Sequence, residues 1–423
     1  MKRFMLILVI CFGMFPLVVS ENPVQAENKT VKNVIFMIPD GFSTAYATGY
    51  RWYKGEKSIM DDMLIGMHRT YSANSVVTDS AAGGTAMATG VKTNNGMIAM
   101  SPSGDRLPTI LQAAQASGRK TGLLTTTTIT YATPAAFASH VQDRKMEADI
   151  APQLIDNKVD VLLGGGREYF PEKLLKQAET EGYQIVTDRK GLSVNSSSDK
   201  LLGLFSDGAM APELDRHRTK EPSLAQMTKA AIRLLQKEKN GFFLMVEGGQ
   251  IDWAGHANDA AWAMNDIEAF EQAVKQAKEF AKKDQQTLVV IAGDHNTGGI
   301  SIGGYNQYAA NIDLLHKMKA TGQYMATQLD QDRNNSKKVL KKYANIVLTP
   351  DEERKIQVAK DPQRAINQVL SKRALIGWTT YEHTGVDVPV YAYGPGAESF
   401  RGLQENTDLP KKMAKLMNIT LSK

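Results

Sequence analysis

Residues 242–256 read FFLMVEGGQIDWAGH, in which an apolar run stops at a carboxylate, Glu247, and two glycines lead into a helical pattern. An uninterrupted apolar run of this length is typical of a strand that is buried on both faces. Other short apolar runs lead in the same way into polar or glycine-containing turns: Val34–Ile38 before Asp40, Thr121–Leu124 before a threonine run, and Leu288–Ala292 before Asp294.

Helical patterns lie between these runs. Ser223 is a candidate N-cap, and the apolar residues after it share one helix face until Asn240-Gly241, where we expect the helix to end. Strands that alternate with helices predict an α/β fold with a large, mostly parallel central sheet and helices on both faces. Function gathers at the carboxyl ends of such strands, so the polar residues found there form the candidate site.

The composition changes at about 305–377 to Lys, Gln, Asn and Met with helical periodicity, including a helix start at Thr349-Pro350. We expect a mainly helical insertion that stands over the sheet. The alternative is that this segment continues the alternation of strands and helices. Since no repeat, low-complexity tract or linker divides the sequence, residues 27–423 are predicted to form a single domain.

The first residues have the pattern of a signal peptide. Lys2 and Arg3 precede an apolar run from Phe4 to Val19, and small residues around Val24-Gln25-Ala26 fit a cleavage site. A membrane anchor is the alternative, but the apolar run is shorter than the roughly 20 residues that a spanning helix needs. We therefore expect residues 1–26 to be removed and the protein to be secreted, extracellular or periplasmic, without a stable membrane anchor.

Charge and cysteine content exclude further classes. The 50 basic and 45 acidic residues are interspersed and give a formal net charge of +5, so no nucleic-acid partner is indicated. Cys11 is the only cysteine and lies in the expected signal peptide. The mature protein therefore cannot form disulfides, and its stability must come from its core or from bound metal.

The helical pattern after Glu247 carries a carboxylate and an imidazole, Asp252 and His256, at a spacing of four residues. This spacing places both side chains on one helix face, where they could bind the same ion. A solvated helix face is the alternative explanation. Glu247 lies five residues before Asp252, at the end of the preceding strand.

Three further motifs carry metal-ligand residue types. Asp294-His295 follows a buried strand, Asp40 follows another, and His383 precedes the expected strand Val388–Tyr393. Taken singly, a catalytic dyad or a simple turn would explain Asp294-His295 as well. Mixed Asp and His ligands without cysteine suit zinc in a catalytic site rather than a structural one.

The candidate nucleophile is Ser80, within the small-residue stretch VTDSAAGGTA at 77–86. This stretch indicates the first turns of a tightly packed helix, where free N–H groups and the helix dipole favour an anion. The alternative is an ordinary helix cap. No Gly-x-Ser-x-Gly elbow is present at Ser80, so an α/β-hydrolase triad is not indicated and a metal would have to activate the serine.

Two residues could complete such a site. Thr133 supplies a hydroxyl that can reach a hard cation, and Arg144, eleven residues later, supplies a guanidinium that can bind two phosphate oxygens. Either residue alone would be unremarkable.

Taken together and in this order, the motifs resemble those of the bacterial alkaline phosphatases, from about Asn33 to Gly396. The resemblance implies a catalytic domain of that family that hydrolyses small phosphomonoesters with two zinc ions and one magnesium ion. Family members are often homodimers, which leaves a homodimer as an expectation. The positions that carry the resemblance are Asp40, Asp79-Ser80-Ala81-Ala82, Thr133-Pro134-Ala135-Ala136, Arg144, 247–256, Asp294-His295 and His383-Thr384-Gly385.

The resemblance also implies roles for matched positions. Ser80 would be phosphorylated, Asp79 would help to position Arg144, and Arg144 would bind the phosphate. The ligands implied for one zinc are Asp252, His256 and His383. The ligands implied for the other zinc are Asp40, Asp294 and His295. The ligands implied for magnesium are Asp40, Thr133 and Glu247.

Two positions depart from the family's pattern. Tyr131 stands where relatives usually have Asp or His near the third metal, and tyrosine is a poor ligand near neutral pH. Trp253 stands near the expected substrate site, where some relatives have lysine. We expect the first change to affect magnesium binding and the second to affect phosphate affinity.

Two other activities compete with a phosphomonoesterase. A phosphodiesterase or sulfatase could use the same scaffold, because fold and metal site alone do not fix the ester that is attacked. Arg144 favours monoesters, because its two donors match two unesterified phosphate oxygens. The other rival is a non-catalytic secreted protein that binds phosphate or metal.

Overall fold

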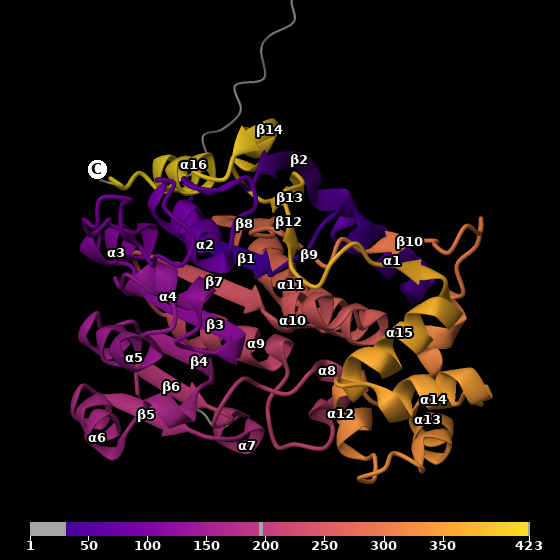
Figure 1. The fold of residues 1–423 in the computed structure, drawn as a ribbon. Helices are drawn as coiled ribbons and strands as arrows, with labels where there is room; N and C mark the ends of the chain where they lie inside the picture. The colour runs from indigo at the N-terminus through magenta and orange to yellow at the C-terminus, as the bar shows by residue number, and fades with distance from the viewer. Residues whose placement is uncertain (1–30, 194–197, 422–423) are drawn as a thin grey trace, which may run out of the picture.

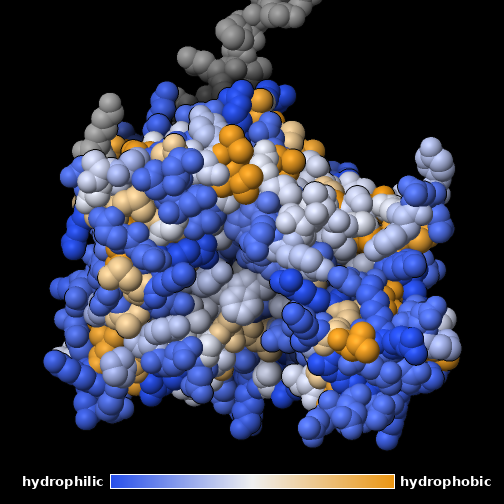
Figure 2. Space-filling model, viewed as in Figure 1, coloured by the Kyte–Doolittle hydropathy of each residue, from blue (hydrophilic) through white to orange (hydrophobic). Residues whose placement is uncertain are grey.

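The computed structural model describes residues 31–193 and 198–421. The expected signal peptide at 1–26 lies outside these residues. None of the described helices combines the length and the apolar character that crossing a bilayer requires. Figure 2 shows one face of the molecule, which is mainly hydrophilic with apolar residues in small separate patches.

A large sheet forms the centre of the molecule (Figure 1). Among the described residues it has ten strands in the order β14-β2-β13-β8-β1-β7-β3-β4-β6-β5. Strand β13 runs antiparallel to both of its neighbours, and the other pairs are parallel, so the predicted mostly parallel sheet is confirmed. In sheet order the strands are Gly402–Glu405, Leu64–Arg69, Val388–Tyr393, Thr287–Ala292, Asn33–Pro39, Phe242–Gly248, Lys120–Thr128, Val161–Gly165, Lys200–Leu204 and Tyr183–Val186.

Helices cover both faces of this sheet, as predicted. The helices that pack on one face are α1 (Thr44–Lys54), α7 (Arg189–Ser193), α9 (Leu224–Leu235), α10 (Gln250–Ala257) and α11 (Ala260–Asp284). The helices that pack on the other face are α2 (Ser80–Thr89), α3 (Ile110–Ala116), α4 (Ala132–Ala138), α5 (Glu147–Asp156), α6 (Glu172–Thr180) and α16 (Asp408–Leu416).

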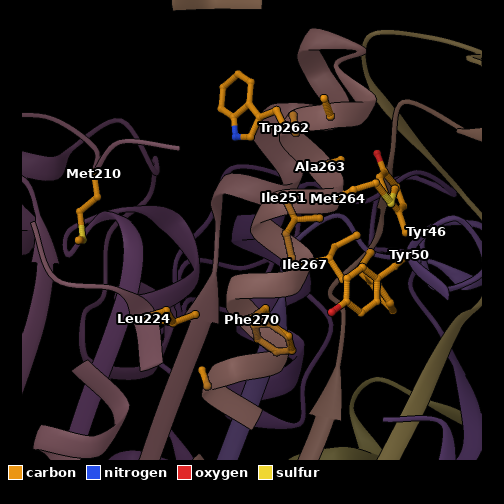
Figure 3. Close-up of a cluster of buried hydrophobic side chains, with 14 of the residues drawn as sticks. Tyr46, Tyr50, Met210, Leu224, Ile251, Trp262, Ala263, Met264, Ile267 and Phe270 are labelled. Carbon is orange, nitrogen blue, oxygen red and sulfur yellow. The ribbon is translucent and has the colours of Figure 1, made fainter. Parts of the chain in front are cut away.

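The central strand β1 shows why its sequence is continuously apolar. Ile35 and Met37 belong to one core cluster, whereas Val34, Phe36 and Ile38 belong to the other. Successive side chains of a strand point to opposite faces, and here both faces are covered by helices. On the first face, Ile251, Ile267 and Phe270 lie beside Tyr46 and Tyr50 of α1 (Figure 3).

Residues 305–377 contain several short helices, which form a group at the lower right of Figure 1. Strands β10 (Ser301–Ile302) and β11 (Ile376–Gly377) pair at the two ends of this segment. Helix α14 begins after Thr349 with a capping box, as its sequence predicts. The segment's elements are η3 (Ile312–Lys317), α12 (Gly322–Thr327), α13 (Ser336–Ala344), α14 (Pro350–Val358) and α15 (Pro362–Ala374).

The remaining short elements are η1 (Asp61–Met63), η2 (Arg167–Tyr169), α8 (Glu213–Arg216), β9 (Asn296–Thr297), β12 (His383–Thr384) and η4 (Ala397–Phe400). Strands β9 and β12 pair with each other and matter most here, because they lie at the candidate site.

Helix α9 starts as predicted and ends earlier than predicted. Ser223 forms a capping box with Gln226. The helix ends at Leu235 instead of Asn240-Gly241, because the N–H groups of the following residues bond to carbonyls three residues back, in tighter turns. Gly241, with φ of +91°, then directs the chain into β7.

Candidate active site

Three carboxylates lie at the carboxyl ends of the central strands. Strands β8, β1 and β7 are neighbours and run parallel, so these ends reach the same edge of the sheet. Asp40 follows β1, Glu247 lies at the end of β7, and Asp294 follows β8. All three side chains are fully buried. The sheet order thus brings together residues that are far apart in the sequence.

His295 joins two of these carboxylates in a first cluster. Its Nε2 lies 3.1 Å from Asp294 Oδ2 and 3.5 Å from Asp40 Oδ1. The ligand atoms of Asp40, Asp294 and His295 all lie within 4.8 Å of one another. One divalent cation could therefore contact all three side chains.

Helix α10 and strand β12 build a second cluster beside the first. Asp252 Oδ2 and His256 Nε2, four residues apart on α10, are separated by 3.4 Å. Because β12 pairs with β9, His383 Nε2 comes within 3.5 Å of Asp252 Oδ1 and 3.1 Å of His256 Nε2. The rings of His383 and His295 stack at 3.6 Å, so the two clusters adjoin.

The backbone fixes the orientation of both imidazoles in the second cluster. His256 Nδ1 is hydrogen-bonded to the Tyr381 carbonyl, and His383 Nδ1 lies 2.8 Å from the Thr78 carbonyl. Since a carbonyl can only accept, each Nδ1 donates, and in the neutral ring Nε2 keeps its lone pair. The two Nε2 lone pairs then face each other over 3.1 Å, an arrangement that a shared cation stabilises.

Four buried carboxylate oxygens of the candidate site have no hydrogen-bond partner among the described residues: Asp40 Oδ1, Glu247 Oε1, Asp252 Oδ2 and Asp294 Oδ2. Burial and then repulsion from Asp294 raise the pKa of Asp40 well above its ordinary value, and burial raises the pKa of Glu247 to about 7. Burying several carboxylates this close together is costly, even with imidazoles beside them. The donor set therefore fits bound divalent cations.

The pKa of His256 also indicates that the second cluster favours a positive charge. Burial lowers the pKa of this imidazole, but its contact with Asp252 raises it to about 9. His256 therefore favours a positive charge beside Asp252, which either a proton or a metal ion can supply.

Ser80 is the first residue of α2 and lies against the first cluster. Its Oγ is 3.1 Å from His295 Nε2, and the side chain is buried. The N-cap of the helix is Asp79, whose Oδ1 accepts a hydrogen bond from the Ala82 N–H at 2.9 Å. Ser80 thus lies where the helix dipole favours an anion.

The small residues of α2 allow it to approach the site closely. A Cβ on Gly83 would lie 3.2 Å from Asp294 Cβ, and one on Gly84 would lie 3.2 Å from Ala136 Cβ on α4. Both distances are tighter than ordinary contacts. The stretch around Ser80 therefore consists of small residues because α2 is wedged between α4 and the loop that carries Asp294.

Arg144 faces a cavity of about 430 Å³ together with Ser80, His256 and His383. Its Nη1 lies 3.2 Å from Asp79 Oδ2, a contact in line with the role that the family resemblance implies for Asp79. The guanidinium, the serine hydroxyl and the second cluster thus border one space that could hold a phosphoryl group.

Thr133, on α4, lies beside the first cluster. Its hydroxyl is 3.4 Å from Asp40 Oδ2. Glu247 accepts hydrogen bonds from Thr125 and, at 3.4 Å, from Thr127. Side-chain hydrogen bonds also connect Glu247 with Asp40 and Thr133. The three residues implied for the third metal therefore belong to one buried polar group.

Trp253 is the predicted site residue that the structure places least directly. It is not among the described residues that line the cavity. Its ring packs edge-on against Tyr131, with 6.0 Å between ring centroids, and Tyr131 lines the cavity. Trp253 therefore reaches the cavity through Tyr131.

Comparisons with known proteins agree with this geometry. The alkaline phosphatase family model matches residues 31–419. Alkaline phosphatase 3 of Bacillus subtilis (strain 168) is 42% identical, over 97% of this chain and 94% of its own length. The chain belongs to the alkaline phosphatase family. It is therefore an enzyme, a hydrolase of phosphoric monoesters, and its substrates are in general small phosphomonoesters.

Solved alkaline phosphatases share its fold. The cold-active alkaline phosphatase of the psychrophile Shewanella sp. has a TM-score of 0.86 and 36% identity, over 91% of this chain and 99% of that chain. A substituted TAB5 alkaline phosphatase with Mg bound in its M3 site has a TM-score of 0.71 and 29% identity, over 93% and 99%. The α/β fold predicted from the sequence is thus that of the alkaline phosphatases.

Sequence reasoning missed several residues of this alkaline phosphatase's candidate site. Thr297 donates a hydrogen bond to Asp252 Oδ1 and lies 3.2 Å from His295 Nδ1. Its position two residues after His295 could have identified Thr297 as a candidate site residue from the sequence. Asn95, Lys145 and Glu147 line the cavity from positions where no sequence pattern distinguishes them from surface residues.

Proposed function

We propose that this chain is a secreted alkaline phosphatase that hydrolyses phosphate monoesters through a phosphoserine at Ser80, with two zinc ions and one magnesium ion. The observation that carries the proposal is the position of Ser80 Oγ, 3.1 Å from His295 Nε2. At that point the serine borders both Asp/His clusters and the cavity that Arg144 faces.

The two clusters suggest how the zinc ions would be held. The residues proposed for one zinc are Asp252, His256 and His383. The residues proposed for the other zinc are Asp40, Asp294 and His295. Carboxylate oxygens without hydrogen-bond partners support both sets, and the facing Nε2 atoms of His256 and His383 support the first. We assign magnesium to Asp40, Thr133 and Glu247, an all-oxygen set of the kind this ion prefers.

When bound, such cations lower the pKa of a coordinated hydroxyl and offset negative charge as it develops. Ser80 gives up its hydroxyl proton and Oγ forms a bond to phosphorus. At the same time the bond from phosphorus to the ester oxygen breaks, and that oxygen takes up a proton and leaves as the alcohol. Water then cleaves the new ester and releases phosphate, and the Ser80 hydroxyl is restored. Arg144 holds two unesterified oxygens throughout, and the N-terminus of α2 favours their charge.

Arg144 also accounts for a preference for monoesters over diesters. A monoester keeps three unesterified oxygens, so two can face Arg144 while the third faces the carboxylate and imidazole clusters. A diester keeps only two.

We further propose that residues 27–423 act as one catalytic domain with a helical insertion at about 305–377, that residues 1–26 direct secretion, and that the enzyme is a homodimer.

One assay tests the proposed activity. Purified protein, loaded with zinc and magnesium, is given a nitrophenyl monoester, the matching diester and the matching sulfate. We expect the monoester to be hydrolysed fastest, chelator to stop hydrolysis, and added zinc with magnesium to restore it. Faster hydrolysis of the diester or sulfate would reassign the activity, and tight phosphate binding without any hydrolysis would indicate a binding protein.

A further inference from the structure

Arg144 lies between two side chains that come from different parts of the chain. On one side, its Nη1 is 3.2 Å from Asp79 Oδ2. On the other side, the centre of its guanidinium lies 4.9 Å from the centroid of the Tyr131 ring. This distance is within the roughly 6 Å range of a cation–π contact. The Arg144 side chain is 19% exposed, so it is largely enclosed by protein.

The Asp79 contact alone does not fix the plane of the guanidinium. Asp79 Oδ2 also accepts a hydrogen bond from the Gly96 N–H at 3.0 Å, and Oδ1 is occupied by the N–H of Ala82. Asp79 is therefore well anchored, but among the described residues its hydrogen bond to the Arg144 guanidinium reaches Nη1 alone. A single hydrogen bond holds one nitrogen in place, but the guanidinium plane can still rotate about that nitrogen. A flat ring beneath the guanidinium restricts that rotation.

Tyr131 is itself held in place. It is the N-cap residue of α4, and its N–H donates to the Thr128 carbonyl at 2.9 Å. Its ring meets Trp253 edge-on at an interplanar angle of 67°. Trp253 lies on α10, the helix that carries Asp252 and His256, and packs against the core. The Tyr131 ring is thus tied to the helix that builds the second cluster.

We propose that Tyr131 is a positioning residue, whose ring sets the plane of the Arg144 guanidinium so that two of its N–H donors face the phosphoryl group. The inference rests on the proposed function, which assigns Arg144 to that group. A planar fork binds two oxygens well only when its plane is correctly placed. A guanidinium that binds two unesterified oxygens leaves a third one free in a monoester and none in a diester. Tyr131 therefore also strengthens the preference for monoesters over diesters.

Two substitutions at Tyr131 separate the ring from the rest of the side chain. Tyr131→Leu removes the ring, and Tyr131→Phe keeps it. In metal-loaded Tyr131→Leu we expect inhibition by inorganic phosphate to weaken about two- to thirtyfold, the range of one cation–π contact. The kcat/KM for the nitrophenyl monoester should fall by a similar factor, and more than that for the diester. Tyr131→Phe should stay within about threefold of the wild-type values.

A double-mutant cycle with Arg144→Ala tests whether Tyr131 acts through Arg144. When Arg144 is already Ala, Tyr131→Leu should change kcat/KM by less than about twofold, because the partner of the ring is absent. Equal losses in both backgrounds would overturn the proposal. So would a Tyr131→Phe variant as impaired as Tyr131→Leu, or a loss of bound metal in Tyr131→Leu that accounts for the whole effect.

Tyr324 offers a matched control. Its ring lies under Arg218 at 4.2 Å, and neither residue is among those that line the cavity. Tyr324→Leu should leave phosphate inhibition unchanged. Calorimetry with inorganic phosphate keeps the inference separate from the proposed function. If the wild type hydrolyses no ester, the proposed function fails, whereas weaker phosphate binding in Tyr131→Leu would still support the positioning role and unchanged binding would overturn it.

Discussion

At the scale of single residues, the surroundings of Ser80 set it apart from other serines of the chain. Its hydroxyl is buried, borders the Asp/His clusters and lies at a helix N-terminus. A serine that only capped a helix would bond to the helix's own N–H groups, and here Asp79 makes that bond. The side chain of Ser80 is therefore available for chemistry.

Ser80→Ala tests this availability. We expect kcat for a nitrophenyl monoester to fall about a thousandfold or more, because the attacking oxygen is removed. Zinc and magnesium content, measured by atomic emission, should stay at the wild-type level, since none of the proposed ligands changes. Activity close to that of the wild type would remove Ser80 from the mechanism.

The individual residues differ in how far the sequence could reveal them. Asp40 and Asp294 follow apolar runs, and parallel strands bring such positions to one edge, so their neighbourhood in space was predictable. The contact between Arg144 and Tyr131 was not, because it depends on how the loop before α5 folds over α4. Periodicity carries no information about such tertiary packing.

At the scale of elements, Asp79 connects helix α2 with the cavity and has two roles. The Asp79 side chain caps the helix, and it also anchors Arg144. Local sequence signals found the caps of α9 and α14 because both use a Ser/Thr followed three residues later by Gln or Glu. They did not assign the cap of α2 to Asp79, because its partner at that spacing, Ala82, has no polar side chain.

Two substitutions of Asp79 separate its two roles. Asp79→Ala should lower the free energy of unfolding by about 0.5–2 kcal/mol, because the cap is lost. Asp79→Asn should lower it much less, since Asn caps helices as well as Asp does. Both variants remove the negative charge beside Arg144, so both should change inhibition by inorganic phosphate. Thermal unfolding and inhibition assays give the two readouts; equal destabilisation by Ala and Asn would show that the cap contributes little.

At the scale of the whole molecule, the buried clusters couple stability to metal and pH. In protein stripped of metal, burial raises the pKa of Glu247 to about 7, and the Asp252 contact, opposed by burial, raises that of His256 to about 9. A group whose folded-state pKa is raised stabilises the fold at low pH and loses this effect as pH rises through that value. Asp40 acts in the same direction.

We therefore expect the melting temperature of chelator-treated protein to fall between pH 5 and pH 9, by on the order of 5 °C. Bound cations supply the missing positive charge, so the metal-loaded protein should be more stable at every pH in this range and should depend less on pH. Differential scanning calorimetry of both forms is the measurement. A melting temperature that rises with pH in the stripped protein would contradict the assignment of these buried groups.

The architecture of the molecule was predictable in its class and less so in its detail. Alternating strands and helices indicate a parallel sheet, and the structure confirms it. Sequence could not show that β13 enters the sheet antiparallel between β8 and β2, because its apolar pattern is the same for either direction.

The sheet order also constrains how the chain can fold as it is synthesised. Val34 pairs with Phe243 on one side and with Leu288 on the other. More than half of the polypeptide must therefore be synthesised before β1 has a neighbouring strand. His383 emerges later still, and β13 then joins the N-terminal β2 to β8. Such distant pairings make folding slow. A nascent chain that stops short of residue 383 would therefore leave the ribosome with its candidate active site unfinished, however well its earlier helices had formed.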